Sequence, residues 1–357
     1  MLWDVTQADI PELGSVMATG VVASMKSGQW AYVVGNGYES TDGQAYLLVI
    51  DMRDGSLIQK IPTDTETDNG LGPVTPVFDA NRNVIAVYAG DKRGRLWRFD
   101  LSSDTPATWA AESSRRALFR AESPSGGRQP ITTAPRLVPH PMGGTVVNFG
   151  TGKFFELGDP MDTRVQSLYG VWERNGSSGT LTRSNLRQLT IGAGPTREVT
   201  GGPLNWRTQL GWHIDMPVGA ERIIANPFVT GGVVNFTSYV PNAESDPCKG
   251  EGGSYLYAID PLTGVGTGRV SSTALLGGSA LLRMAPVSRA FANTTSKADL
   301  VSMMQGRFNA DGSATAQAND ARNPCIRIGG GHGGAVAGGG SACGPMREWR
   351  IWREGLR

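Results

Sequence analysis

Residues 88–101 read Tyr-Ala-Gly-Asp-Lys-Arg-Gly-Arg-Leu-Trp-Arg-Phe-Asp-Leu, and this stretch decides the fold class. An apolar run ends at Tyr88, and Gly90 and Gly94 then allow the backbone to reverse its direction. β-Forming residues resume at Leu96 and continue through the end of the stretch. The stretch therefore predicts a hairpin of two antiparallel strands joined by a tight turn.

The same pattern occurs in three other places, each with a β-rich run that ends near glycine, a variable loop, and an apolar run that closes on an acidic residue. The first runs are residues 31–38, 146–152 and 233–237, and the second runs are residues 45–51, 167–173 and 254–260. Each unit has an apolar face that it cannot bury alone, so units of this kind stack around an axis as the blades of a β-propeller. We therefore predict an all-β fold, a β-propeller formed by residues 1–357 as a single domain, with a β-sandwich or a β-solenoid as alternatives.

Long loops are predicted where the spacing between the repeats widens, at residues 102–130, 174–207 and 305–346. A binding surface is expected in these loops first, because loops on a rigid scaffold carry most recognition. Residues 296–306 have some helical periodicity but fit a strand equally well. The tryptophans in β-like stretches are expected to pack in the core, namely Trp97, Trp172, Trp206, Trp212, Trp349 and Trp352.

The composition excludes several classes of protein. The chain has 357 residues, 39% of them hydrophobic, and its 49 glycines and 21 prolines favour many strands and turns. The net charge is +1 and the basic residues are scattered, so no nucleic-acid partner is expected. No apolar run reaches the roughly 18 residues of a membrane-spanning helix, and no export signal opens the sequence. Because the first residues look like mid-domain sequence, we expect part of a longer protein whose true N-terminus lies elsewhere.

The three cysteines, Cys248, Cys325 and Cys343, do not have the spacing of a zinc site. Three single pairings are possible, and the sequence does not choose among them. A bond between Cys325 and Cys343 would close a glycine-rich loop. Three free thiols are the equal alternative.

Six short sequence motifs follow one another through nearly the whole chain, at residues 35–38, 69–71, 88–101, 149–153, 167–170 and 349–353. Together they resemble the C-terminal domain of the PilC/PilY family of type IV pilus tip and biogenesis proteins. The resemblance implies a modified β-propeller similar to the quinoprotein alcohol dehydrogenases, with about seven blades, which would be incomplete here. It also implies export to the cell surface, the outer membrane or the pilus tip. The expected role is to promote pilus assembly against retraction through contacts with pilus components such as minor pilins, and a host-cell surface is a further expected partner.

The resemblance also implies a calcium loop just before residue 88. The positions that match its alternating oxygen ligands are Asp79, Asn81 and Asn83. Val84 stands where glycine is expected, and one carboxylate with two amides would hold calcium weakly. The alternative is a plain β-turn, because Asp and Asn favour turns. A similar alternation at residues 309–313 is interpreted as a turn.

No enzymatic activity is expected. The alternative function is that of a quinoprotein-like oxidoreductase, because residues 259–264 resemble the repeated blade motif of those enzymes. In the enzymes this motif usually continues to a tryptophan, but it does not do so here, so no quinone cofactor is expected. The three histidines, His140, His213 and His332, have no Gly-x-Ser-x-Gly nucleophile elbow nearby and are interpreted as structural. A degenerate fragment with only a scaffold function is the third possibility.

Overall fold

The computed structural model describes residues 3–17, 20–192, 197–201, 203–230, 232–241 and 253–266. Within these residues the regular structure consists of β-strands and short 3-10 helices, without an α-helix, which confirms the all-β prediction. The strands are β1 (Val21–Met25), β2 (Trp30–Gly35), β3 (Tyr46–Asp51), β4 (Leu57–Pro62), β5 (Leu71–Phe78), β6 (Asn83–Asp91), β7 (Arg95–Asp100), β8 (Arg115–Arg120), β9 (Arg136–Pro139), β10 (Thr145–Gly150), β11 (Ser167–Glu173), β12 (Arg187–Ile191), β13 (Val199–Thr200), β14 (Gly211–Asp215), β15 (Arg222–Ile223), β16 (Phe228–Thr230), β17 (Val233–Val240) and β18 (Gly253–Ile259). The 3-10 helices are η1 (Pro106–Ala110), η2 (Glu112–Ser114), η3 (Asp159–Met161) and η4 (Arg183–Asn185).

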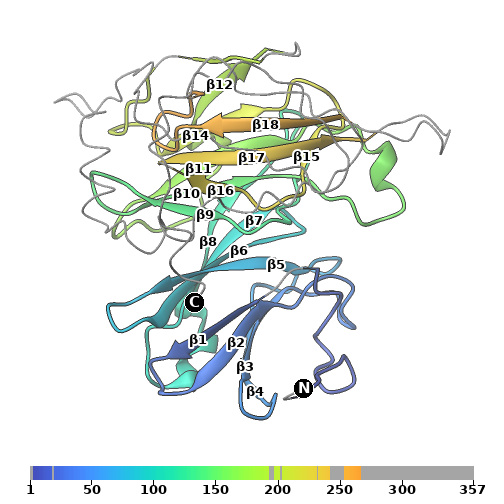
Figure 1. The fold of residues 1–357 in the computed structure, drawn as a ribbon, viewed down its shortest axis with the longest axis vertical. Helices are drawn as coiled ribbons and strands as arrows, with labels where there is room; N and C mark the ends of the chain where they lie inside the picture. The colour runs from blue at the N-terminus through green and yellow to red at the C-terminus, as the bar shows by residue number, and fades with distance from the viewer. Residues whose placement is uncertain are drawn as a thin grey trace, which may run out of the picture.

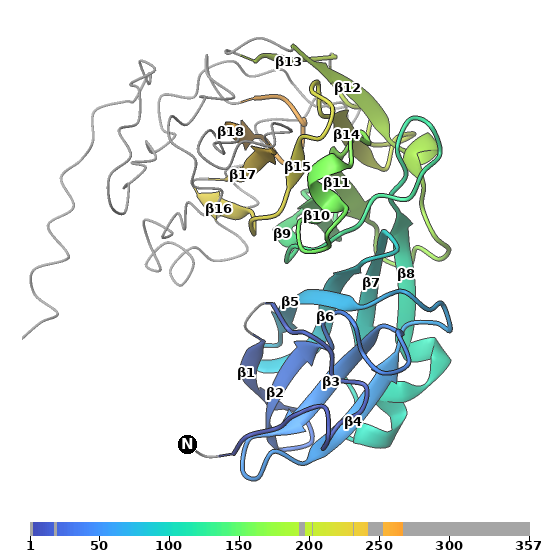
Figure 2. The same ribbon diagram turned by 90° about the vertical axis from the view of Figure 1, so that its right-hand side faces the viewer.

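The strands form four blade-like units that follow one another along the chain (Figure 1). Unit 1 comprises β1–β4, unit 2 β5–β8, unit 3 β9–β14 and unit 4 β15–β18. Units 1 and 2 share one sheet because β1 pairs with β6 in parallel over two residues. In unit 3, β9, β10, β11 and β14 are antiparallel, and β12 adds a parallel strand beside β14. Figure 2 shows the units arranged around an arc, so the described residues form an open part of a β-propeller with fewer blades than the about seven implied for the family.

All four predicted hairpins are confirmed. They are the antiparallel pairs β2–β3, β6–β7, β10–β11 and β17–β18. In the second of them Gly90 pairs with Leu96, and Gly94 closes the turn with a φ of +82°, a backbone conformation that favours glycine. The repeated motif therefore corresponds to the two middle strands of units 1, 2 and 3, and to β17 and its neighbour β18 in unit 4.

Three of the hydrophobic clusters in the described part of the core are each shared by two consecutive units, because alternate residues of a strand point to opposite faces of its sheet. Val49 of unit 1 and Phe99 of unit 2 belong to one cluster. In unit 3, Val147 faces unit 2 whereas its neighbour Val146 faces unit 4, where Phe236 lies. A unit therefore cannot bury either face without its neighbours.

The outer face of unit 1 is covered by residues 3–15. Ile10 and Leu13 from this segment pack against Leu48 and Ile50 of β3. The indole N–H of Trp3 donates a hydrogen bond to a backbone carbonyl of the β3–β4 turn at 3.1 Å. This segment stands where the neighbouring blade of a closed propeller would pack.

Backbone contacts join each unit to the next. A Cβ atom at Gly90 would overlap the side chain of Ile131, so glycine permits the close approach of units 2 and 3. The N–H of Ile131 donates to the carbonyl of Asp91 at 3.0 Å, and the N–H of Ile223 donates to the carbonyl of Thr151 at 2.9 Å in the same way. The last residue of β6 and the residue after β10 thus accept a backbone hydrogen bond from the segment that begins the following unit.

Two of the predicted loops contain regular structure. Residues 102–130 include η1, η2 and strand β8, and residues 174–207 include η4, β12 and β13. In β8 only Leu118 and Phe119 are buried, and the surrounding arginines hide the strand pattern. The third predicted loop, residues 305–346, lies outside the described residues.

The predicted core tryptophans that the structure describes are core residues, and the two described histidines, which the sequence analysis interpreted as structural, are buried as well. Trp97, Trp172, Trp206 and Trp212 are buried. His140 packs against Trp172 and Trp206, with ring centroids 4.0 and 4.6 Å away, and burial lowers its pKa to about 3. His213 is buried in β14.

Several predictions fall outside the described residues. They concern Cys248, Cys325, Cys343, His332, Trp349, Trp352 and residues 296–306 and 309–313. In the part of the chain that the structure covers, no helix has the length and apolar character needed to cross a membrane.

Candidate functional site

A cavity of about 250 Å³ is lined by residues from all four units. We call it the axial mouth. It is lined by Val16 and Met17 before β1, Val34 and Tyr38 at the end of β2, Leu71 and Gly72 of β5, Thr132 before β9, Phe154 and Phe155 in the β10–β11 loop, and Ile224 and Asn226 before β16. Most of the lining side chains are apolar, and polar atoms also reach the cavity surface. Strands β2 and β5 line the mouth directly, and β9 and β16 begin shortly after the lining residues Thr132 and Asn226.

Tyr38 is the residue of the mouth that stands out chemically. Its side chain is 3% exposed, and its hydroxyl has no hydrogen-bond partner among the described residues. The ring stacks on Phe155, with centroids 4.4 Å apart. Burial raises the pKa of Tyr38, and the charge of Asp91 acts in the same direction. The phenol is therefore neutral and rigidly held, and its hydroxyl is a buried polar group without a partner among the described residues.

Asn36 explains why the chain places Tyr38 there. Its side-chain amide donates to the carbonyls of Glu12 and Gln44 at 2.9 Å each, and its carbonyl oxygen accepts the N–H groups of Tyr46 and Leu71 at 3.0 Å each. Four hydrogen bonds thus tie the end of β2 to three other segments. The next residue is a glycine with a φ of +75°, which turns the chain toward the cavity.

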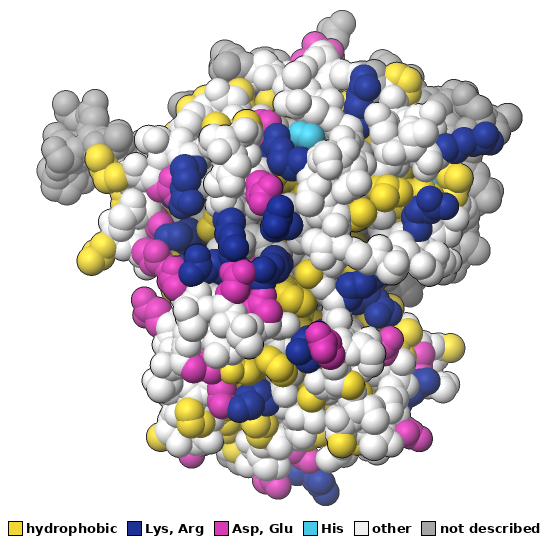
Figure 3. Space-filling view, turned by 180° about the vertical axis from the view of Figure 1, so that it is seen from behind, with side chains coloured by type: hydrophobic (Ala, Val, Ile, Leu, Met, Phe, Trp, Pro, Cys, Tyr) yellow, Lys and Arg dark blue, Asp and Glu magenta, His cyan; other side chains and the backbone are white. Residues whose placement is uncertain are grey.

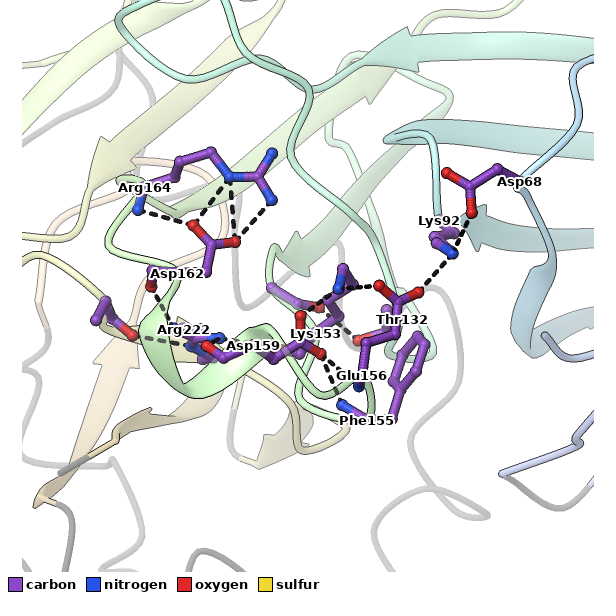
Figure 4. A network of polar contacts seen from close by, with 12 residues as sticks. Asp68, Lys92, Thr132, Lys153, Phe155, Glu156, Asp159, Asp162, Arg164 and Arg222 are labelled. Atoms are coloured by element: carbon purple, nitrogen blue, oxygen red, sulfur yellow. Dashed lines mark hydrogen bonds and ion pairs between the residues drawn. The ribbon is translucent and has the colours of Figure 1, made fainter. Parts of the chain in front are cut away.

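A chain of ion pairs borders the mouth (Figure 4). The Nζ atom of Lys92, at the end of β6, lies 2.6 Å from Asp68 and 2.5 Å from Glu156. Glu156 is also 2.7 Å from Lys153, which in turn pairs with Asp159. The chain of charges therefore connects unit 2 to the long β10–β11 loop of unit 3.

Asp159 anchors that loop. It is buried, and one of its carboxylate oxygens accepts the N–H groups of Phe155 and Glu156 at 2.8 Å each. Burial opposes the ionisation of Asp159, but the hydrogen bonds from Lys153 and from these two N–H groups outweigh it and hold the pKa of the carboxyl below its usual value. The carboxylate thus fixes the aromatic wall formed by Phe155.

Arg222 extends the network to unit 4. Its guanidinium donates to the carbonyls of Lys153, Asp159 and Asp162 at 3.0, 2.8 and 2.6 Å. The carboxylate of Asp162 pairs with Arg164 at 2.6 Å. Figure 4 shows these contacts beside the chain of ion pairs. These charges pair with one another or with backbone carbonyls, and none of them is a lining residue of the cavity, whose side chains are mostly apolar.

The predicted calcium residues lie in the β5–β6 turn, at the end of β5 that is farthest from the mouth. One oxygen of Asp79 accepts the N–H groups of Asn81 and Asn83 at 2.8 Å each, and the other accepts the side-chain amide of Asn83 at 3.3 Å. The N–H of Asn83 is the main cause that lowers the pKa of Asp79. The structure brings the three residues together as a hydrogen-bonded turn, and calcium binding there stays a prediction.

Among the described residues, no group of three or more His, Cys, Asp or Glu side chains could hold a metal ion. The sequence analysis did not single out the axial mouth. Its residues come from segments far apart in the sequence, between Val16 and Asn226. The phrases at residues 35–38 and 149–153 were the available signal, because they end in Tyr38 and lead into Phe154.

The family model for the PilY1 β-propeller domain matches residues 6–195, which is more than half of the chain. This chain belongs to the PilY1 family. It is similar to the type IV pilus biogenesis factor PilY1 of Pseudomonas aeruginosa strain PAO1, with 35% identity over 321 residues and 76% of this chain covered. A PilY1 homologue of Xylella fastidiosa is 32% identical over 292 residues and covers 74% of the chain.

A solved PilY1 structure supports the same fold. The crystal structure of the Pseudomonas aeruginosa PilY1 C-terminal domain matches with a TM-score of 0.64 and 33% identity, over 74% of this chain and 62% of that one. The chain spans 27% of the length of the Pseudomonas PilY1 and 20% of that of the Xylella homologue. The PilY1 resemblance and the propeller fold predicted from the sequence are thus confirmed.

Proposed function

We propose that this chain acts in type IV pilus biogenesis as an exported, non-enzymatic binding domain, and that its axial mouth binds an extended segment of a pilus component such as a minor pilin. Membership of the PilY1 family supports the pilus role, because the relatives are named as pilus biogenesis factors. The action is to favour pilus assembly over retraction. A location at the cell surface or the pilus tip, on the outer membrane side, and contact with a host-cell surface belong to the same proposal.

The hydroxyl of Tyr38 is the observation that carries the proposed site. A buried polar group without a partner costs about 1–3 kcal/mol, so a ligand that bonds this group regains that free energy on binding. Apolar walls from Val34, Leu71 and Phe155 suit an aliphatic or aromatic side chain, and the hydroxyl suits a backbone carbonyl beside it. An extended protein segment supplies both groups.

The experiment compares the binding of purified minor pilins to the purified chain and to its Tyr38→Phe variant by biolayer interferometry. The variant removes one buried unpartnered hydroxyl, so we expect its thermal stability to be unchanged or higher. We expect its affinity to fall about fivefold or more, because a hydrogen bond to the ligand is lost.

Tyr46→Phe is the matched control. The hydroxyl of Tyr46 donates to Asp42 at 2.5 Å and does not line the mouth, so this variant should lose stability and keep its affinity. Equal affinity of the Tyr38→Phe variant and the natural chain would rule out this site. Absence of any pilin binding would count against the wider proposal.

A further inference from the structure

A second pocket lies between units 2 and 3 and shares no residue with the axial mouth. Its volume is about 370 Å³, and its side chains come from β6, β7, β8, β11 and the two turns that flank the β10–β11 hairpin. We call it the arginine pocket, because it is lined by Arg98, Arg116 and Arg174. Glu173 is the one carboxylate among its lining residues, and Asp100, outside the lining, lies 3.5 Å from Arg98, so three cations stand near two carboxylates.

Glu173 organises two of the arginines. It accepts a hydrogen bond from the hydroxyl of Tyr88 at 2.5 Å and pairs with Arg116. The Nε atom of Arg98 lies 3.6 Å from it. Its side chain is 12% exposed, whereas the side chains of Arg98 and Arg116 are 31% and 29% exposed. The carboxylate therefore lies at the bottom of the pocket and the two guanidinium groups keep a solvent-facing side.

Arg174 supplies the charge that is not compensated. It is exposed, its guanidinium lies over the ring of Trp172 with 5.2 Å to the centroid, and within the described part of the chain it has no carboxylate at ion-pair distance. Figure 3 shows one face of the molecule, on which basic side chains stand among acidic ones. The indole holds the guanidinium in place without neutralising it.

We propose that the arginine pocket binds a carboxylate side chain of an acidic segment of a partner protein. Charge complementarity argues for an anion, since Arg98 and Arg116 pair with Asp100 and Glu173 whereas Arg174 leaves one positive charge uncompensated at the pocket. The planar guanidinium groups match a carboxylate in two-pronged hydrogen bonds. Glu173 opposes a doubly charged phosphate more than a singly charged carboxylate, and the polar lining does not suit an apolar side chain. This site is independent of the proposed pilin contact at the axial mouth.

The experiment measures the fluorescence anisotropy of a fluorescein-labelled hexaglutamate peptide titrated with the purified chain at low ionic strength. The Arg174→Gln variant should bind about fivefold more weakly, because an exposed cation at the pocket is removed. The Glu173→Gln variant should bind severalfold more tightly, because the repelling charge is removed. Arg53→Gln is the matched control, since the Arg53 side chain is 78% exposed and lies in the β3–β4 turn of unit 1.

Circular dichroism and thermal melting check that each variant folds, and Arg174→Gln alone decides the result if Glu173→Gln does not fold. Equal weakening by Arg53→Gln and Arg174→Gln would overturn the proposal, because net charge alone would then explain the binding. Lack of peptide binding would overturn it too. If inorganic phosphate displaces the peptide better than acetate does at equal ionic strength, the pocket is a phosphate site and the proposal is also wrong.

Discussion

The axial mouth and the arginine pocket both involve units 2 and 3, yet their charges are organised in opposite ways. Around the mouth, four carboxylates pair with four cations, and Arg222 bonds backbone carbonyls beside them. The carboxylates are Asp68, Glu156, Asp159 and Asp162, and the cations are Lys92, Arg93, Lys153 and Arg164. In the arginine pocket three cations stand near two carboxylates. The first arrangement stabilises loops and leaves an apolar cavity, whereas the second leaves charge available to a ligand. Charged residues in one fold thus serve structure at one site and recognition at the other.

The comparison predicts that the carboxylate at the mouth matters more for stability than the one in the pocket. Asp159→Ala leaves two N–H groups without their acceptor in a buried place and Lys153 with Glu156 as its remaining carboxylate, so we expect a loss of about 3 kcal/mol in the free energy of unfolding. Glu173→Ala should cost about 1 kcal/mol, because the arginines that it releases reach solvent. Urea denaturation measures both. Equal losses would show that the two sites do not differ in this way.

Asp91 is a third case beside the two sites, because it is a buried carboxylate whose hydrogen-bond donors are all neutral. It accepts the indole N–H of Trp97 and the N–H of Arg95 at 2.8 Å each, and the amide of Asn69 at 3.3 Å. Burial raises its pKa to about 6 in spite of these bonds. The folded protein therefore binds the proton more tightly than the unfolded chain does, and protonation stabilises the fold.

This contribution to stability is present below about pH 4 and is lost as the pH rises through 6. Relative to an Asp91→Asn variant, the free energy of unfolding of the natural chain should fall by about 3 kcal/mol between acidic and neutral pH. Urea denaturation at a series of pH values tests this expectation. A constant difference between the two proteins across the series would contradict it.

The smallest expected effect concerns the β5–β6 turn, which has neither the ion-pair network of the mouth nor the excess charge of the pocket. Asp79 with two amides predicts calcium binding with a dissociation constant of about 10⁻³ M, and Asp79→Ala should abolish it. The same substitution should lower stability by about 1 kcal/mol, because two N–H groups lose their acceptor. Titration calorimetry and urea denaturation measure the two effects. Calcium binding that persists in the variant would place the ion elsewhere.

The sequence predicted the part of the fold that depends on local pattern. The four hairpins followed from β-forming runs and glycine turns, as at Gly90 and Gly94, and the burial of Trp97 and Trp172 followed from their place in the repeats. Strand β8 was missed because four of its six residues are arginine or alanine, which carry little strand signal.

Neither pocket could be predicted from the sequence. Tyr38 and Phe155 are more than a hundred residues apart, and their stacking depends on how consecutive units pack. Arg98, Arg116 and Arg174 belong to three different strands or turns, and scattered arginines predict an ordinary solvated surface. Only the arrangement of units 2 and 3 brings them to one place.

The hydrogen bonds from Ile131 to Asp91 and from Ile223 to Thr151 have a mechanical consequence. Each one joins the backbone of one unit to that of the next, beside a hydrophobic cluster that both units share. A pulling force along the arc would therefore have to break a backbone hydrogen bond and expose a buried hydrophobic cluster in the same step. We therefore expect the arc to resist tension, because the force between consecutive units passes through these backbone hydrogen bonds and the shared hydrophobic clusters.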